Sequence, residues 1–158
     1  MKIVFTKSNN IISKLICGIT GEPFSHVAII PFDECVFHST FTGVNFITYT
    51  RFMESKSNVC ELPINGDLSH VSEIAFRYGK ASYDFKALLW CGLMLTLRRW
   101  FPKWIPKQNL WQSSGMFMCT ELITAILGEV DSMITPYQLY LKLTMELNNE
   151  YTNSIKPT

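Results

Sequence analysis

Residues 26–38 read HVAIIPFDECVFH, and this stretch decides how the first half of the chain is expected to fold. Its two ends, 26–30 and 35–38, are short runs rich in β-branched and aromatic residues, which favour strands. The segment between them, 31–34, contains Pro and Asp, which are typical of turns. The stretch therefore predicts a β-hairpin.

Two histidines occupy the two arms of this predicted hairpin. If 31–33 forms a three-residue loop, His26 lies directly opposite His38, with their Cβ atoms about 5 Å apart on one face. A shift of one residue in the pairing would place them on opposite faces. Such a pair is more often part of a core or a surface than of a shared site, so a functional interpretation needs a third group.

Strands are expected beside the hairpin and helices in the second half of the chain. The residue preferences predict further strands at 2–6, 43–49 and 58–62. Apolar residues spaced three and four apart predict helices at 11–18, 71–79, 85–100, 119–128 and from Pro136 onward. Their expected caps and stops are Ser8, Gly18, Asp67 or Ser69, Gly79, Gly128, and Thr135 with Gln138. Early strands and late helices indicate one α+β domain over 1–158, with a small antiparallel sheet packed against helices.

The composition narrows the class of protein. The chain has 158 residues, and 17% of them are charged against about 25% in typical soluble domains. Its 47% of hydrophobic residues excludes disorder, and its net charge of +1 argues against a nucleic-acid partner. The apolar segment 85–97 is interrupted by Lys86 and is shorter than the roughly 20 residues that span a bilayer. The opening MKIVFTKSNN lacks the apolar core of a secretory signal, so a cytoplasmic location is expected.

The cysteines point to free thiols. Their odd number and spacing match neither a disulfide framework nor a metal knuckle. The five are Cys17, Cys35, Cys60, Cys91 and Cys119. Only Cys119 lies in the first turn of a predicted helix, where backbone N–H groups and the helix dipole stabilise a thiolate. The other four are expected to fill small spaces in the core, and Cys119 needs a nearby base before it can be called a nucleophile.

Four short motifs, taken in their order along the chain, resemble a known family. They are SHVAI at 25–29, VFHSTFTGV at 36–44, YDF at 83–85 and FMCTEL at 117–122. A histidine strand, a second polar residue twelve positions later and a late helix-start cysteine resemble the circularly permuted papain-like amidohydrolases. These include NlpC-like and YiiX-like enzymes of bacteria and phages and the lecithin retinol acyltransferase group. The resemblance runs from the opening strand to the Thr135–Pro136 helix start.

The resemblance implies a cysteine-dependent site without metal or cofactor. Cys119 would be the nucleophile, His26 the general base and then acid, and His38 the orienting third member, where relatives often carry a carboxylate. The backbone N–H of Cys119 would stabilise the oxyanion, with Tyr83 as a second donor, although a tyrosine beside a helix start is more often a packing residue. Glu121, two residues past the nucleophile, is interpreted as structural. Two histidines and one cysteine are also zinc ligands, but no fourth ligand is evident.

The segment 85–120 is unusual because it contains no acidic residue, five basic ones and all four tryptophans. One interpretation is a helix packed on the sheet with a solvated basic end. Another is contact of 85–111 with a lipid surface, which single-stranded nucleic acid would match less well. Candidate residues for substrate or membrane contact are Arg98, Arg99, Trp100 and Trp104.

The expected function is therefore a cysteine hydrolase that cleaves an amide through a thioester, with a cell-wall (peptidoglycan) peptide or a related amide as substrate. One alternative is a lipid acyl hydrolase or acyltransferase at a membrane surface. A second alternative is a catalytically inactive binding module. If the chain is phage-encoded, the host cytoplasm or the virion becomes its place of action.

Overall fold

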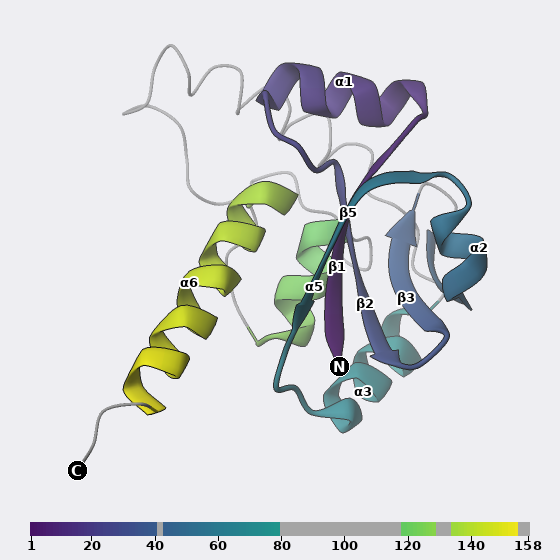
Figure 1. The fold of residues 1–158 in the computed structure, drawn as a ribbon. Coiled ribbons are helices and arrows are strands. Elements are labelled where there is room, and N and C mark those ends of the chain that lie inside the picture. The colour runs from purple at the N-terminus through teal and green to yellow at the C-terminus, as the bar shows by residue number, and fades with distance from the viewer. Residues whose placement is uncertain (41–42, 80–117, 129–133, 155–158) are drawn as a thin grey trace, which may run out of the picture.

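A five-stranded antiparallel sheet forms the centre of the computed structural model, which describes residues 1–40, 43–79, 118–128 and 134–154 (Figure 1). The strands lie in the order β4-β3-β2-β1-β5, and each pairs antiparallel with its neighbours. They are β1 (Lys2–Ser8), β2 (His26–Phe32), β3 (Cys35–Thr40), β4 (Gly43–Thr48) and β5 (Lys56–Pro63). The predicted α+β class and the antiparallel sheet are confirmed.

Helices cover both faces of this sheet. They are α1 (Ile11–Thr20), α2 (Tyr49–Met53), α3 (Leu68–Tyr78), α5 (Cys119–Ile126) and α6 (Pro136–Ser154). On one face α5 packs against β2 and β3, with α3 and α6 beside it. On the other face α2 packs through Phe52.

The central strand β2 is buried on both faces, which explains its nearly unbroken run of apolar residues. Val27 and Ile29 belong to the core that contains Leu122 of α5. Ala28 and Ile30 alternate with them and belong to the core on the α2 side. Because successive side chains of a strand point to opposite faces, one hairpin arm supplies both cores.

Helix α1 begins and ends at different residues from those predicted. Its N-cap is Asn10, whose Oδ1 accepts the Ser13 N–H at 2.7 Å, and not Ser8, which is held in β1. The helix continues through Gly18 and ends before Gly21, which has a φ of 71°. The left-handed conformation that glycine adopts readily is available at Gly21, so the chain closes the helix there and accepts the small helical cost of Gly18.

The capping predictions for the later helices are confirmed. The Asp67 side chain accepts the Ser69 N–H at 2.8 Å at the start of α3. Thr135 and Gln138 form the predicted capping box at α6, each side chain accepting the other residue's backbone N–H. Gly128, with a φ of 74°, closely follows the end of α5. These signals are readable from sequence because cap and helix are only a few residues apart.

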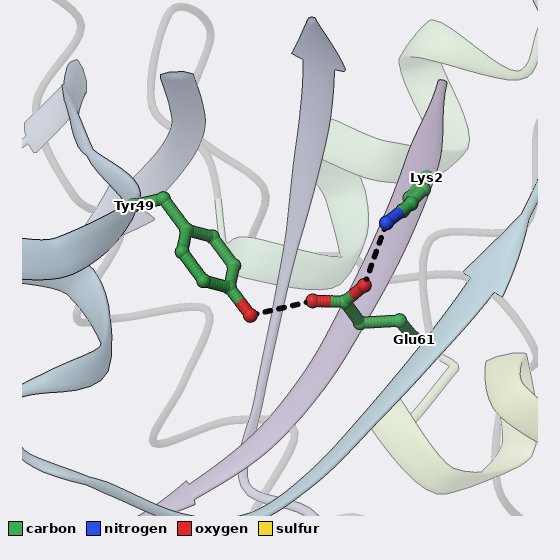
Figure 2. Close-up of polar contacts among 3 residues, drawn as sticks. All are labelled: Lys2, Tyr49 and Glu61. Atoms are coloured by element: carbon green, nitrogen blue, oxygen red, sulfur yellow. Dashed lines mark hydrogen bonds and ion pairs between the residues drawn. The ribbon is translucent and has the colours of Figure 1, made fainter. Parts of the chain in front are cut away.

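Helix α2 was not predicted from the sequence. The strand predicted at 43–49 corresponds to β4, which ends at Thr48. The Thr48 side chain caps the helix that Tyr49 begins. The Tyr49 hydroxyl donates to Glu61 Oε1 at 2.7 Å, and Lys2 Nζ donates to Glu61 Oε2 at 3.1 Å (Figure 2). These contacts connect α2 with β1 and β5 across one face of the sheet.

The predicted helix at 85–100 and Cys91 lie outside the described residues. Cys17, Cys35, Cys60 and Cys119 are free thiols. In the described parts of the chain, no helix combines the length and apolar character needed to cross a membrane.

Candidate functional site

The site candidates lie at one end of the sheet, where several elements begin or end. Strand β1 ends there at Ser8 and β3 at Thr40, while β2 begins at His26, β5 at Lys56 and α5 at Cys119. All five residues line one hollow of about 160 Å³. Helix α1 lies across this end of the sheet (Figure 1). The topology thus places the predicted thiol and one predicted imidazole on the walls of the same hollow.

Buried serine hydroxyls attach α1 to the strands around this hollow. Ser13 of α1 accepts the backbone N–H of Ser8 at 2.9 Å, and its hydroxyl is hydrogen-bonded to that of Ser25. Ile12 and Ile16 of α1 provide the apolar part of the wall. The hollow therefore has hydroxyl groups at the strand ends and hydrocarbon on the helix side.

His26 and His38 are brought together on one face of the sheet, as predicted. Their ring centroids are 5.7 Å apart, and both rings approach Phe52 of α2, at 6.0 and 5.5 Å. This arrangement puts the two imidazoles on the α2 side of the sheet.

The prediction that the two histidines lie directly opposite each other is wrong. Phe32 pairs with Cys35, which leaves a two-residue turn in place of the expected three-residue loop, and Ile29 pairs with Phe37. Counting on from that pair places Ala28, not His26, opposite His38. The turn can be this short because Glu34 adopts a positive φ of 64°, a conformation that its sequence did not indicate.

Both imidazoles are held neutral at pH 7. The amide oxygen of Asn45 accepts a hydrogen bond at 3.1 Å from His38 Nε2, and the other ring nitrogen, Nδ1, is buried without a partner among the described residues. Burial, together with the charge of Lys56, lowers the pKa of His38 to about 4, against the opposing effect of Asn45. Burial, Lys56 and His38 hold the pKa of His26 well below 6.5.

Cys119 is the first residue of α5 and its side chain is buried. Burial raises the pKa of the Cys119 thiol, and the nearby Glu121 carboxylate raises it further. Backbone N–H groups of Val27, Thr120 and Cys119 itself lower that pKa, but less than burial raises it. The expectation that the helix start lowers the thiol pKa overall is therefore wrong, because desolvation outweighs the backbone dipoles.

Glu121 is held at the start of α5 and is almost fully buried. Its Oε2 accepts the backbone N–H of Met118 at 2.8 Å, so the side chain caps the helix from its third position. This contact supports its interpretation as a structural residue.

Cys119 and His26 face the same hollow without a hydrogen bond between them. The thiol lies against the backbone N–H of Val27, the residue that follows His26 along β2. The Nε2 atom of His26 is buried and has no hydrogen-bond partner among the described residues. The rings of His26 and His38 contact the α2 side, whereas Cys119 packs in the α5 core.

Lys56 is a site residue that the sequence interpretation missed. Its ammonium donates to Ser8 Oγ at 2.9 Å and lies 4.8 Å from the ring centroid of Phe52. Burial lowers the pKa of Lys56, and the Cys119 thiolate opposes that effect. The only available signal was its position just before the predicted strand at 58–62, where a lysine is normally taken as solvated.

The remaining predicted site residues lie outside the described residues. They are the expected oxyanion donor Tyr83 and the candidates for substrate or membrane contact, Arg98, Arg99, Trp100 and Trp104. Within the described ranges, no group of three or more His, Cys, Asp or Glu side chains is arranged to hold a metal ion.

No model of a known protein family matches this chain, and no characterised protein shows significant sequence similarity to it.

Proposed function

We propose that the chain is a thiol-dependent hydrolase of the circularly permuted papain-like type, with Cys119 as nucleophile and His26 as general base. The observation that carries the proposal is the hollow at the end of the sheet, lined by both a helix-start thiol and an imidazole whose Nε2 has no partner among the described residues. An unpartnered buried nitrogen is costly, so an imidazole whose Nε2 is buried without a partner among the described residues, in the same hollow as a thiol, favours a chemical role.

The proposed reaction is acyl transfer through a thioester. Neutral His26 accepts the thiol proton while Cys119 Sγ forms a bond to the substrate carbonyl carbon, and the backbone N–H of Cys119 stabilises the oxyanion. The imidazolium then gives its proton to the leaving amine as the carbon–nitrogen bond breaks. A water molecule hydrolyses the thioester, again with His26 as base. His38, beside His26 and fixed by Asn45, limits the orientations of the His26 ring.

An amide in a cell-wall peptide is the substrate we favour. A lipid acyl group is the second candidate, because α1 contributes Ile12 and Ile16 to the hollow and exposes Ile11 and Leu15 beside it. An apolar chain could leave the hollow along this surface of α1.

The test is trapping of the acyl-enzyme. The protein is mixed with p-nitrophenyl acetate, an activated ester that needs little specific binding, quenched in acid and analysed by peptide mass spectrometry. We expect an acetyl group on Cys119, a rate at least tenfold lower in His26→Ala, and no change in His70→Ala, the matched control on α3. Labelling of Cys119 that is equally fast in His26→Ala contradicts the proposed base.

Substrate class is then decided with peptidoglycan peptides and with short- and long-chain acyl esters, using Cys119→Ala as the blank. Turnover of peptides alone supports the amide hydrolase, and turnover of acyl esters that increases with chain length supports the lipid alternative. A wild-type protein that is folded but forms no acetyl-enzyme is a binding module, which refutes the proposal.

A further inference from the structure

The Lys56 side chain lines the hollow, and its ammonium has no carboxylate partner among the described residues. Within the described parts of the chain, the ion pairs are Lys2 with Glu61 and Arg77 with Glu73, so Lys56 takes part in neither. Its contacts are the Ser8 hydroxyl and the face of the Phe52 ring. A partly buried cation loses hydration, and a hydroxyl and an aromatic ring replace that hydration only in part. A negative charge near the Lys56 ammonium would therefore be stabilised.

The ionisable groups around the hollow leave one candidate for that counter-ion. From β2 and β3 come His26 and His38, which are neutral imidazoles at pH 7. From α5 come Glu121, which caps its own helix through Met118, and the Cys119 thiol. The walls supplied by α1 are hydroxyl, amide and aliphatic groups. Of the described groups that line the hollow, Cys119 is the one that can become an anion facing Lys56.

We propose that Lys56 is a positioning residue that stabilises the Cys119 thiolate, so that the reactive ion pair is thiolate and ammonium and not thiolate and imidazolium. The inference deepens the proposed function, since it takes Cys119 as the nucleophile. When the thiol ionises, the S–H bond breaks, Sγ keeps the electron pair and the proton leaves through the His26 imidazole to solvent; His26 takes a proton back from solvent before it protonates the leaving amine. The hollow then changes from one net positive charge to none.

The electrostatics of the neighbouring groups agree with this pairing. Burial, and after it the charge of Lys56, lowers the pKa of both His26 and His38, which keeps His26 unprotonated and able to accept the thiol proton. The Cys119 thiolate in turn raises the pKa of Lys56. Glu121 is the one charged side chain of the described residues that acts on the pKa of the Cys119 thiol, and it disfavours the thiolate, so the pairing with Lys56 rests on the hollow that both residues line.

The test measures alkylation of Cys119 by iodoacetamide between pH 6 and pH 10, located by peptide mass spectrometry. Lys56→Met removes the charge but keeps the length of the side chain, and Lys56→Arg keeps the charge. Lys14→Met is the matched control, because Lys14 is an exposed lysine on α1 and its loss changes the net charge equally.

In Lys56→Met we expect the midpoint of the pH profile to move to higher pH and the rate at pH 7 to fall about tenfold, the effect of losing one nearby opposite charge. The plateau rate at pH 10 should match wild type, which shows that access to the thiol is unchanged. Lys56→Arg should restore the wild-type midpoint, and Lys14→Met should keep it. A wild-type midpoint in Lys56→Met overturns the inference. If Lys56→Met fails to fold, Lys56→Gln, which keeps a donor to Ser8, is measured in its place and decides by the same midpoint.

The alkylation experiment and the acetyl-enzyme experiment can fail independently of each other. A shifted midpoint in Lys56→Met with no acetyl-enzyme in wild type supports the ion pair and refutes the hydrolase. An acetyl-enzyme in wild type with an unshifted midpoint supports the hydrolase and refutes the ion pair.

Discussion

Acidification is expected to destabilise the fold through His38, which is buried, and His26, which is half-buried, well before most carboxylates titrate. The pKa of His38 is about 4 in the folded chain and has an ordinary value of 6.5. The unfolded chain therefore binds a proton between these pH values that the folded chain does not, so stability falls as the pH falls through this window. One pKa unit is worth about 1.4 kcal/mol, so the full effect of His38 is about 3 kcal/mol.

Most of this loss of unfolding free energy falls between pH 7 and pH 5, where the protein can be assayed. Between pH 7 and pH 5 the linkage relation assigns about 2 kcal/mol to His38 alone. His26, whose pKa is also lowered by burial, adds to the loss in the same direction. Both contributions are fully present above pH 6.5 and are lost on acidification.

The assay is urea unfolding followed by circular dichroism at fixed ionic strength, at pH 7 and pH 5. His38→Gln is the informative variant, because its amide can still donate to Asn45 but does not titrate. We expect this variant to lose about 2 kcal/mol less than wild type between the two pH values. His70→Gln on α3, which replaces a histidine outside this pair, is the control variant. Equal losses in wild type and His38→Gln would refute the idea that the fold holds His38 neutral.

Three further substitutions test individual contacts. Glu121→Gln keeps an acceptor for the helix start but removes a charge that raises the pKa of Cys119, so iodoacetamide labelling of that thiol at pH 8 should become about threefold faster. Asn10→Ala should lower the free energy of unfolding by about 1 kcal/mol in urea titrations, because α1 loses its N-cap. Glu61→Gln should cost less than about 1 kcal/mol, since this polar contact is partly solvated. The same change should lower the raised pKa of Tyr49 toward 10.0, as followed by NMR titration of 13C-labelled tyrosine.

The sequence was most informative where a structural cause lies within a few residues of its effect. The β-rich run 26–30 predicted a strand, and the capping residues Asp67 and Thr135 predicted two helix starts, all of which the structure shows. Helix α2 was missed because a five-residue helix has little periodicity of its own. It is held by Phe52, which packs on one face of the sheet, and by the hydrogen bond from Tyr49 to Glu61 of β5, twelve residues later in the chain.

The candidate site was predictable in its residue types but not in its electrostatics. The family resemblance carried by the order of His26, His38 and Cys119 implied one site with an imidazole and a thiol, and His26 and Cys119 line one hollow in the structure. The direction of the thiol pKa was wrong in the sequence interpretation, because helix position can be read locally whereas burial cannot. Lys56 was missed for the same reason, since the strand that carries it reaches the hollow only by pairing with β1.

Local patterns in the sequence thus determined that this chain forms a hairpin-centred α+β domain with a helix-start cysteine and two strand histidines. The tertiary structure alone decided the offset between those histidines, the neutrality of their rings, the burial of the thiol and the position of Lys56 at the hollow. The physical reason is that propensity, capping and alternation act over a few residues. Desolvation and charge–charge interactions depend on which distant segments the sheet brings within a few ångströms of each other.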